Sequence, residues 1–222
     1  MNMLKTFKMD FLGIRPYITW RPILFFVLFS VGFTYFMDLS FFPMVFAMTM
    51  SLMIMTYPFV TGEDSGTERL YRMIGMEDED TVRGRYLYSL VVFLVATLAA
   101  LVIMNGVNLV KSGTLIIGES FAVGGLYLVM YIFFMDINVP IFFAVGHKKA
   151  KGVAGAALII ATMIVIGLSG FANSAFPGEV KALYQWAMGH ILFVVIGAVL
   201  LIALLTALSY SIALAKFKKR DL

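Results

Sequence analysis

The chain has 222 residues, of which 61% are hydrophobic and only 14% are charged, and its formal net charge is +4. Its mean hydropathy is +0.94. A soluble domain carries about 25% charged residues, so this composition excludes an ordinary water-soluble protein and indicates an all-α integral membrane protein, because a bilayer can accommodate the apolar surface.

The charge and the missing cysteines narrow the chemistry. The positive residues lie at the edges of the apolar stretches, so we explain them by membrane topology and expect no nucleic acid partner. The sequence has no cysteine, which excludes disulfides, thiolate chemistry and cysteine-based metal sites. We expect no metal or other cofactor to be bound by this chain.

Six stretches approach the roughly 20 apolar residues that a spanning helix needs. They predict six transmembrane helices within a single transmembrane domain, residues 1–222, at 22–37, 41–60, 86–110, 121–145, 153–172 and 190–215. Lys and Arg concentrate on the cytoplasmic side of a membrane protein. With six spans, 15 of the 17 Lys and Arg residues fall on one side, which places both termini in the cytoplasm.

Residues 1–21 alternate basic and bulky apolar side chains. Phe7, Phe11, Ile14 and Ile18 recur at helical spacing, which predicts an elbow helix lying in the cytoplasmic interface. The alternative is a frayed cationic tail. No small-residue cleavage site follows a short apolar core, so we do not expect a cleaved signal peptide.

The segment 61–85 is the one long polar cytoplasmic connection, and it holds 7 of the 13 acidic residues. Ser65 and Glu68 have the spacing of a capping box, which predicts a short helix over 66–74 that stops at Gly75. Leu70, Met73 and Ile74 share one face of this helix. The acids at 77–80 would then favour the N-terminus of the third span.

A helix this short is not stable alone. It must dock on lipid, on its own bundle or on another protein. The acidic flank argues against anionic lipid, which leaves the bundle and a cytoplasmic partner as alternatives.

Several strings in this layout resemble the ABC-2 type permeases, in particular the small six-span half-transporter kind. The strings are Tyr57-Pro58-Phe59-Val60-Thr61-Gly62-Glu63-Asp64, Glu68-Arg69-Leu70-Tyr71-Arg72, Val82-Arg83-Gly84-Arg85-Tyr86-Leu87, Lys8-Met9-Asp10-Phe11-Leu12, and the stretch from Val139 to Ala150. The chain departs from the family after the short helix, where Met73-Ile74-Gly75-Met76 replaces a frequent Leu-Pro pair.

The resemblance implies a permease subunit of an ATP-driven exporter in a bacterial cytoplasmic membrane, working as a homodimer or related heterodimer. ATP and Mg would bind a separate ABC ATPase, and the sequence carries no G-x-x-x-x-G-K-[ST] phosphate loop. The short helix would be the coupling helix that seats on the ATPase. The residues implied for that contact are Glu63, Asp64, Ser65, Glu68, Arg69, Leu70, Arg72, Met73 and Ile74.

Two further features allow two interpretations each. The external segment 173–189 carries Pro177-Gly178 and an apolar face of Val180, Leu183, Tyr184 and Ala187. It is either a short gate-like helix between the fifth and sixth spans, as the family resemblance implies, or an aromatic anchor at the interface. Asp136, with Asn138 close by, is a costly acid within a span. It is either part of a substrate path or a structural pair with a tyrosine or basic residue that holds a helix broken by Pro140.

Two other function classes remain open. An intramembrane enzyme needs acids, histidines or serines converging at one depth, and we find one deep acid. A secondary transporter often has internal repeats with broken helices, and the two halves show no convincing repeat. For the permease, the apolar lining favours a hydrophobic or amphipathic substrate, and the resemblance implies peptides such as toxins and antimicrobials.

Overall fold

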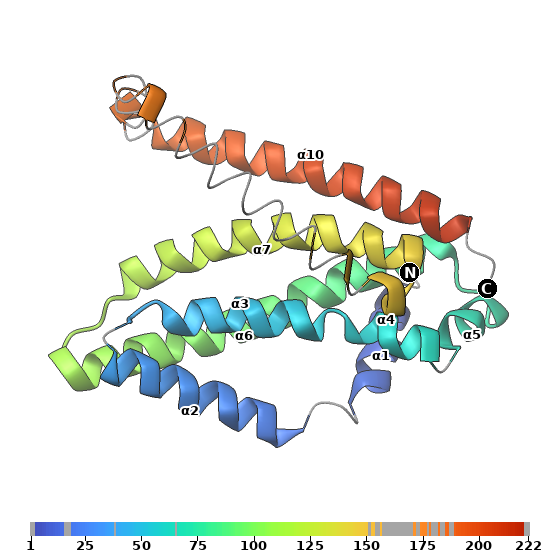
Figure 1. The fold of residues 1–222 in the computed structure, drawn as a ribbon, viewed down its shortest axis with the longest axis horizontal. Coiled ribbons are helices and arrows are strands. Elements are labelled where there is room, and N and C mark those ends of the chain that lie inside the picture. The colour runs from blue at the N-terminus through green and yellow to red at the C-terminus, as the bar shows by residue number, and fades with distance from the viewer. Residues whose placement is uncertain are drawn as a thin grey trace.

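The computed structural model of the chain describes residues 3–15, 19–37, 39–64, 66–150 and 189–219, with short pieces between residues 152 and 186. All regular structure among these residues is helical, as the sequence predicts (Figure 1). The helices are α1 (Met3–Ile14), α2 (Trp20–Phe36), α3 (Phe42–Ile54), α4 (Tyr57–Asp64), α5 (Thr67–Met73), α6 (Asp78–Ser112), α7 (Ile117–Val145) and α10 (Ile191–Lys218).

Four helical segments in the described part of the chain are long and apolar enough to cross a bilayer, and the 17-residue α2 is a shorter apolar helix. The four are Phe42–Asp64, α6, α7 and Leu192–Lys218. Together with α2 they coincide with five of the six predicted spans. The remaining span, predicted at 153–172, lies outside the described residues apart from isolated positions, so the total of six stays a prediction.

The two termini lie at the same end of the bundle as α5 (Figure 1). Tyr71 of α5 donates a hydrogen bond from its hydroxyl to Asp10 Oδ1 of α1 at 2.8 Å. Arg72 Nη2 donates to the carbonyl oxygen of Phe217, near the end of α10, at 3.3 Å. Helix α1, the end of α10 and α5 therefore lie together at one end of the bundle, and the side of the membrane that this end faces stays a prediction.

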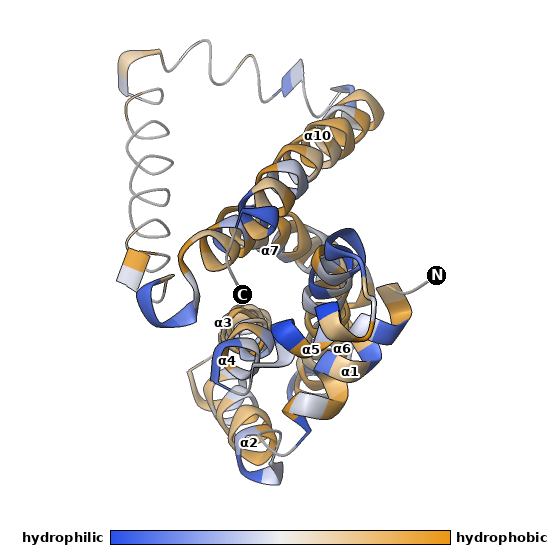
Figure 2. Ribbon diagram, turned by 90° about the vertical axis from the view of Figure 1, so that its right-hand side faces the viewer, coloured by the Kyte–Doolittle hydropathy of each residue, from blue (hydrophilic) through white to orange (hydrophobic). Residues whose placement is uncertain are grey.

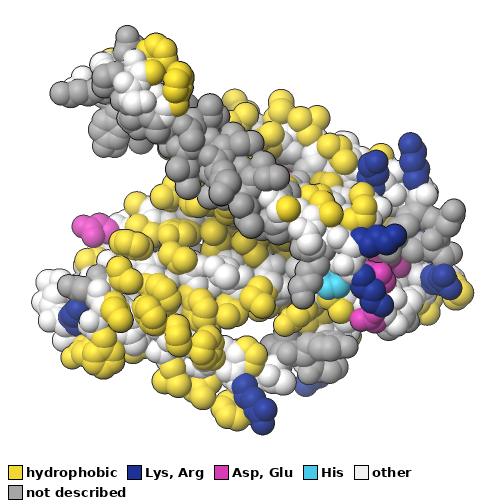
Figure 3. Space-filling model, in the orientation of Figure 1, with side chains coloured by type: hydrophobic (Ala, Val, Ile, Leu, Met, Phe, Trp, Pro, Cys, Tyr) yellow, Lys and Arg dark blue, Asp and Glu magenta, His cyan; other side chains and the backbone are white. Residues whose placement is uncertain are grey.

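Charged and hydrophobic side chains are also separated along the length of the bundle. Figure 2 looks onto the α5 end and shows hydrophilic stretches gathered at the helix ends there. In Figure 3, hydrophobic side chains cover the middle of the visible face, while most of its charged side chains gather near α5. This is the distribution expected when the middle of a bundle faces hydrocarbon and one end faces water.

The segment predicted as a long polar loop is mostly helical. Helix α4 continues the second span to Asp64 after a turn at Met55–Thr56, and α6 begins at Asp78 rather than at residue 86. Carboxylates in the first turn of α6 stabilise this early start. Arg83 also pairs with Glu79 across one turn at 3.3 Å.

The core is built between α6, α7 and the α3–α4 segment. Phe93 of α6 stacks on Tyr131 of α7 with ring centroids 4.2 Å apart. The Tyr131 hydroxyl donates to the carbonyl oxygen of Ser89 at 2.9 Å. Two rings of α7, Phe142 and Phe143, pack on Phe59 of α4 at 5.0 Å each. The bundle therefore holds α6 and α7 in a fixed register.

Helix α1 docks on α6 through a close approach at a glycine. A Cβ atom on Gly84 would lie 2.8 Å from the Cβ atom of Thr6 and 3.3 Å from the carbonyl oxygen of Met3. Thr6 and Ile14, both on the inner face of α1, are fully buried. The elbow helix predicted for residues 1–21 is therefore confirmed as a helix over Met3–Ile14, and it packs on the bundle with one face.

Replacing Gly84 with alanine is expected to push α1 away from α6, because the added methyl group cannot fit beside Thr6. The clash should cost about 1–3 kcal/mol. The chain lacks cysteine, so a single cysteine introduced by Thr6→Cys can be labelled with a maleimide, and its labelling should be faster in the Gly84→Ala background.

The matched control is Gly106→Ala in the same helix, where an added Cβ meets nothing within 4 Å. That change should leave the labelling rate unchanged and stabilise α6 by roughly 0.5–1 kcal/mol through helix propensity. Equal labelling rates in the Gly84→Ala and parent proteins would show that α1 does not depend on this close approach.

Candidate functional site

The short helix α5 forms where the sequence predicts it. It spans Thr67–Met73, and glycines with positive φ flank it: Gly66 at 68° and Gly75 at 74°. The predicted stop at Gly75 is confirmed, because α5 ends at Met73 and Gly75 has a positive φ. The proposed cap residue Ser65 lies outside the described residues, and Gly66 occupies the N-cap position without a side-chain cap hydrogen bond.

One face of α5 is fixed to the bundle by a buried arginine from α6. Glu68 Oε1 accepts a hydrogen bond from Arg85 Nη1 at 2.7 Å, and both side chains are nearly inaccessible. Arg85 Nη2 also donates to the carbonyl oxygen of Pro58 at 3.2 Å. The guanidinium plane lies over the rings of Phe59 and Phe143, at 4.4 and 5.2 Å from their centroids. Glu68 thus binds α6 rather than serving only the start of its own helix.

The elbow helix joins the same buried set. Asp10 of α1 is 3% exposed, and its Oδ2 lies 3.9 Å from Arg85 Nε. Its Oδ1 accepts a hydrogen bond from the hydroxyl of Tyr71, the other buried residue of α5, at 2.8 Å. We call Asp10, Glu68, Tyr71 and Arg85 the buried polar cluster. It links α1, α5 and α6 at one point.

The buried polar cluster holds two carboxyl groups and one guanidinium. Burial raises the pKa of Asp10 to about 6, because its removal from water outweighs the opposing effects of the Arg85 charge and the Tyr71 hydrogen bond. Burial also raises the pKa of Tyr71, so this hydroxyl stays protonated and remains a donor at neutral pH. Arg85 therefore compensates Glu68 first, at the shorter distance, and Asp10 relies on both Arg85 and Tyr71.

A glycine makes room for this arrangement on α4. A Cβ atom on Gly62 would lie 2.9 Å from Arg85 Nη2 and 3.0 Å from Glu68 Oε1. Any larger residue at position 62 would therefore press on the ion pair between Arg85 and Glu68.

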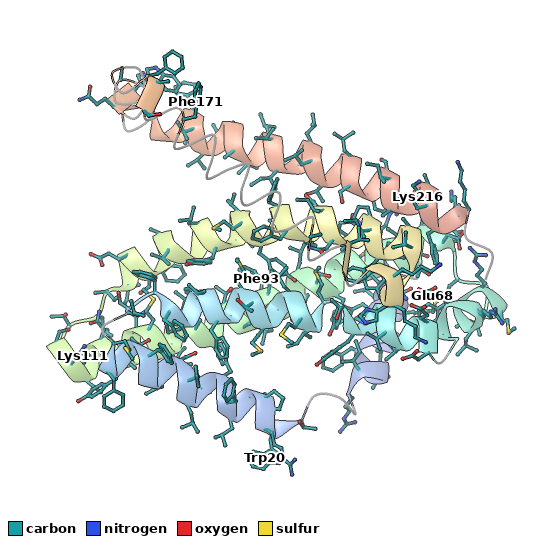
Figure 4. All side chains as sticks on the ribbon, viewed as in Figure 1. Trp20, Glu68, Phe93, Lys111, Phe171 and Lys216 are labelled. Atoms are coloured by element: carbon teal, nitrogen blue, oxygen red, sulfur yellow. The ribbon has the colours of Figure 1, made fainter. Side chains whose placement is uncertain are left out.

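The opposite face of α5 is exposed and apolar. Leu70, Met73 and Ile74 are 47%, 80% and 53% exposed. Figure 4 labels Glu68 at this end of the molecule, on the side of α5 that meets the bundle. Of the two alternatives left open by the sequence, docking on the bundle is the one observed: α5 is held there through Glu68 and Tyr71. Its apolar face remains uncovered within the described part of the chain, and a cytoplasmic partner stays a prediction.

Charged residues surround the exposed face. Arg72 pairs with Asp78 at 3.1 Å and lies over the ring of Phe217, 5.4 Å from its centroid. Asp64 pairs with Lys148 at 3.1 Å, and Glu63 accepts a hydrogen bond from the backbone amide of Lys148 at 3.2 Å. These contacts join α5 to the end of α10, and α4 to the segment that follows α7. Arg69 is exposed.

Asp136 makes polar contacts between two spans. The hydroxyl of Thr206 in α10 donates to its Oδ2 at 2.8 Å, and Ser209 donates to its backbone carbonyl oxygen at 2.7 Å. That carbonyl lies four residues before Pro140, which has no amide hydrogen to offer it. The structural pair expected at Asp136 thus involves hydroxyls rather than a tyrosine or basic residue, and α7 continues through Pro140 without a break.

Asn138, the other residue expected on the substrate path, forms a side-chain hydrogen bond within its own helix. Its side-chain amide donates to the carbonyl oxygen of Phe134 at 2.7 Å, and the residue is 3% exposed. The external segment 173–189 lies mostly outside the described residues, so its gate-like role stays a prediction. No group of three His, Asp or Glu side chains that could hold a metal occurs among the described residues.

Sequence reasoning missed three of the four residues of the buried polar cluster. Arg85 counts there among the charges that set topology, and Asp10 and Tyr71 occur only within family strings. Glu68 was expected at a partner surface and lies buried instead. A basic residue next to Gly84 at the start of an apolar span was the available signal, since a small neighbour allows another helix to approach closely.

Comparison with known protein families gives a match over most of the chain. The family model described as ABC-2 family transporter protein matches residues 6–218. No curated protein and no solved structure matches the chain. The family model covers nearly the whole chain, including α1, α5 and the start of α6, which meet in the buried polar cluster. The chain therefore belongs to the ABC-2 transporter family and is a membrane permease component of an ABC transporter.

Proposed function

We propose that this permease is half of an ATP-driven exporter, in which α5 is the coupling helix that seats on a separate ATPase subunit. The observation that carries the proposal is the division of α5 into two faces. Glu68 and Tyr71 are locked into the bundle, while Leu70, Met73 and Ile74 are exposed. An exposed apolar face at the polar end of a membrane protein favours a protein partner.

Contact with the ATPase would use the exposed residues of the segment. Met73 and Ile74 form the apolar centre, and Arg69 and Leu70 lie beside them. Glu63, Asp64 and Arg72 surround this centre as a polar rim, the usual anatomy of a protein interface. Glu68 would act indirectly, by holding the helix in place from behind.

Motion of α5 has a direct route into the spans. Glu68 is bound to Arg85, which lies in the long helix α6, and Tyr71 is bound to Asp10 of the elbow helix. Buried charged hydrogen bonds are costly to break one partner at a time. Movement of α5 on its ATPase would therefore carry α6 and α1 along with it.

For the substrate and for the number of permease copies, we propose only general classes. The spans offer few charged groups, which favours a hydrophobic or amphipathic cargo, such as a peptide, taken from the cytoplasm or the inner leaflet. Two permease copies would enclose the path, and Asp136 would contribute a polar group to it. Its Oδ1 has no hydrogen-bond partner among the described residues.

Substituting Met73 with aspartate is expected to weaken the permease–ATPase complex by at least about tenfold, because the charge would be buried against an apolar surface. The measurement is co-purification with a stand-alone ABC ATPase co-expressed with the permease, followed by the ATPase activity of the recovered complex. Met73→Leu, which keeps the apolar contact, should behave like the parent protein.

A matched control uses the same change at the far end of the bundle. Met37 is the C-cap of α2 and is 63% exposed, so Met37→Asp introduces the same charge away from α5. It should leave co-purification and ATPase activity unchanged. Full ATPase association and activity in Met73→Asp would refute the coupling role of α5.

Replacing Arg85 with methionine is expected to destabilise the permease by about 3–5 kcal/mol, because two buried carboxyl groups lose their counter-charge. Thermal unfolding in detergent measures the loss. Adding Glu68→Gln to this variant should recover part of the stability, since one unpaired buried charge is removed.

The control is Arg83→Met, two residues earlier in the same helix. Arg83 is about half exposed, pairs with Glu79 at 3.3 Å and donates a hydrogen bond to the Tyr210 hydroxyl at 3.1 Å. These contacts lie at the surface, so the removal of Arg83 should lower the unfolding temperature much less than the removal of Arg85. An Arg85→Met protein as stable as the Arg83→Met protein would contradict the structural importance of the buried polar cluster.

A further inference from the structure

A cavity of about 330 Å³ lies between α1, α2, α3 and α6, separate from the buried polar cluster and from the exposed face of α5. Apolar side chains make up nearly all of its lining, among them Phe11 of α1, Ile23 and Phe26 of α2, Ile54 of α3 and Val92 of α6. No acidic residue is among the lining residues.

The cavity has the length and direction of a hydrocarbon chain. It extends along α6 from Tyr88 to Ala99, and at a rise of about 1.5 Å per residue these positions lie roughly 16 Å apart. One end meets Phe7 and Phe11 of the elbow helix. The cavity therefore begins at the level of the elbow helix and runs into the bundle beside the first span.

One residue of the lining, Tyr88, carries a polar atom that lacks a partner. The hydroxyl of Tyr88 has no hydrogen-bond partner in the described part of the chain, although the residue is only 1% exposed. Its ring lies against Phe7, with centroids 6.3 Å apart. A buried hydroxyl without a partner is unfavourable, so a ligand that accepts a hydrogen bond from Tyr88 would stabilise the folded protein.

Positive charges lie where the cavity reaches the elbow. Arg15 follows the end of α1, and Arg21 lies between the lining residues Thr19 and Pro22. Both are exposed, and neither forms an ion pair with any residue that the structure describes. Figure 4 labels Trp20, next to Arg21, at the end of α2 that leads to the elbow.

We infer that this cavity binds one resident phospholipid of the inner leaflet that carries an anionic headgroup. An acyl chain fills the apolar cavity, and the Tyr88 hydroxyl donates a hydrogen bond to an ester carbonyl at the interface. Arg15 and Arg21 attract the phosphate headgroup, as basic residues beside a span do for anionic lipids. This inference does not depend on the proposed ATPase contact, because the site lies on the permease alone.

The test is native mass spectrometry of the full chain in detergent micelles, titrated with dioleoylphosphatidylglycerol or dioleoylphosphatidylcholine. The two lipids have the same acyl chains and differ in headgroup charge. One phosphatidylglycerol should bind more tightly than any further copy. The Arg15→Gln/Arg21→Gln double variant should lower the preference for phosphatidylglycerol over phosphatidylcholine by about tenfold.

Two variants probe the cavity itself. Tyr88→Phe keeps the shape of the side chain and removes only the unpartnered hydroxyl, so the protein should stay folded while it binds phosphatidylglycerol about 2- to 10-fold more weakly. Ala99→Phe fills the inner end of the cavity and should weaken binding at least tenfold. The matched control is Val102→Phe, one turn further along α6 and 73% exposed, which should bind like the parent protein.

Several results would overturn the inference. Binding unaffected by both Tyr88→Phe and Ala99→Phe would show that the lipid lies elsewhere on the surface. A change in the monomer–dimer ratio in Ala99→Phe with unchanged lipid binding would assign the cavity to a second copy of the chain. Equal binding of the two lipids in the parent protein would exclude the headgroup contacts of Arg15 and Arg21.

Discussion

A single buried guanidinium organises the polar end of this permease. Arg85 is 1% exposed and contacts Glu68 at 2.7 Å, Asp10 at 3.9 Å and the carbonyl oxygen of Pro58 at 3.2 Å. Arginine suits this position because its planar fork presents five donors and stacks on aromatic rings. A charge this deep needs all of its partners, and those partners come from α1, α4 and α5. The position of each helix is therefore fixed by the same side chain.

The contacts of the buried Arg85 explain how α5 can be attached to the bundle on one face and exposed on the other. A helix of seven residues has no stability of its own, so one face must be held by tertiary contacts. Polar contacts hold it here, through Glu68 and Tyr71, which frees the apolar residues Leu70, Met73 and Ile74 to face outward. In a soluble protein the apolar face would be the buried one. The inversion is possible because Arg85 and Asp10 supply specific partners inside the bundle.

Much of the fold could be predicted from the sequence, because hydropathy and helix punctuation are local signals. The positions of α2, α6, α7 and α10, the short helix before Gly75 and the helical elbow all follow from such signals. The buried polar cluster does not, because it joins residues 17, 61 and 75 positions apart. In the sequence, Arg85 lies near the end of a span and looks like the other charges that set the topology. Glu68 in turn fits a capping box, so neither residue is marked as buried. Only the packing of α1 on Gly84 reveals which charges are buried.

The distribution of polar contacts also divides the spans into two groups. Helices α6, α7 and α10 are joined by directional hydrogen bonds, from Tyr131 to Ser89 and from Ser209 to the carbonyl of Asp136. Helix α2 packs on α3 mainly through aromatic rings, such as Phe33 on Phe42 at 4.5 Å. Stacked aromatic rings surrounded by hydrocarbon can slide past one another at little cost in energy. Hydrogen bonds, in contrast, hold the helices that they join in one register. A movement of α5 that is transmitted to α6 should therefore shift α6 relative to α2. The lipid cavity lies at this boundary.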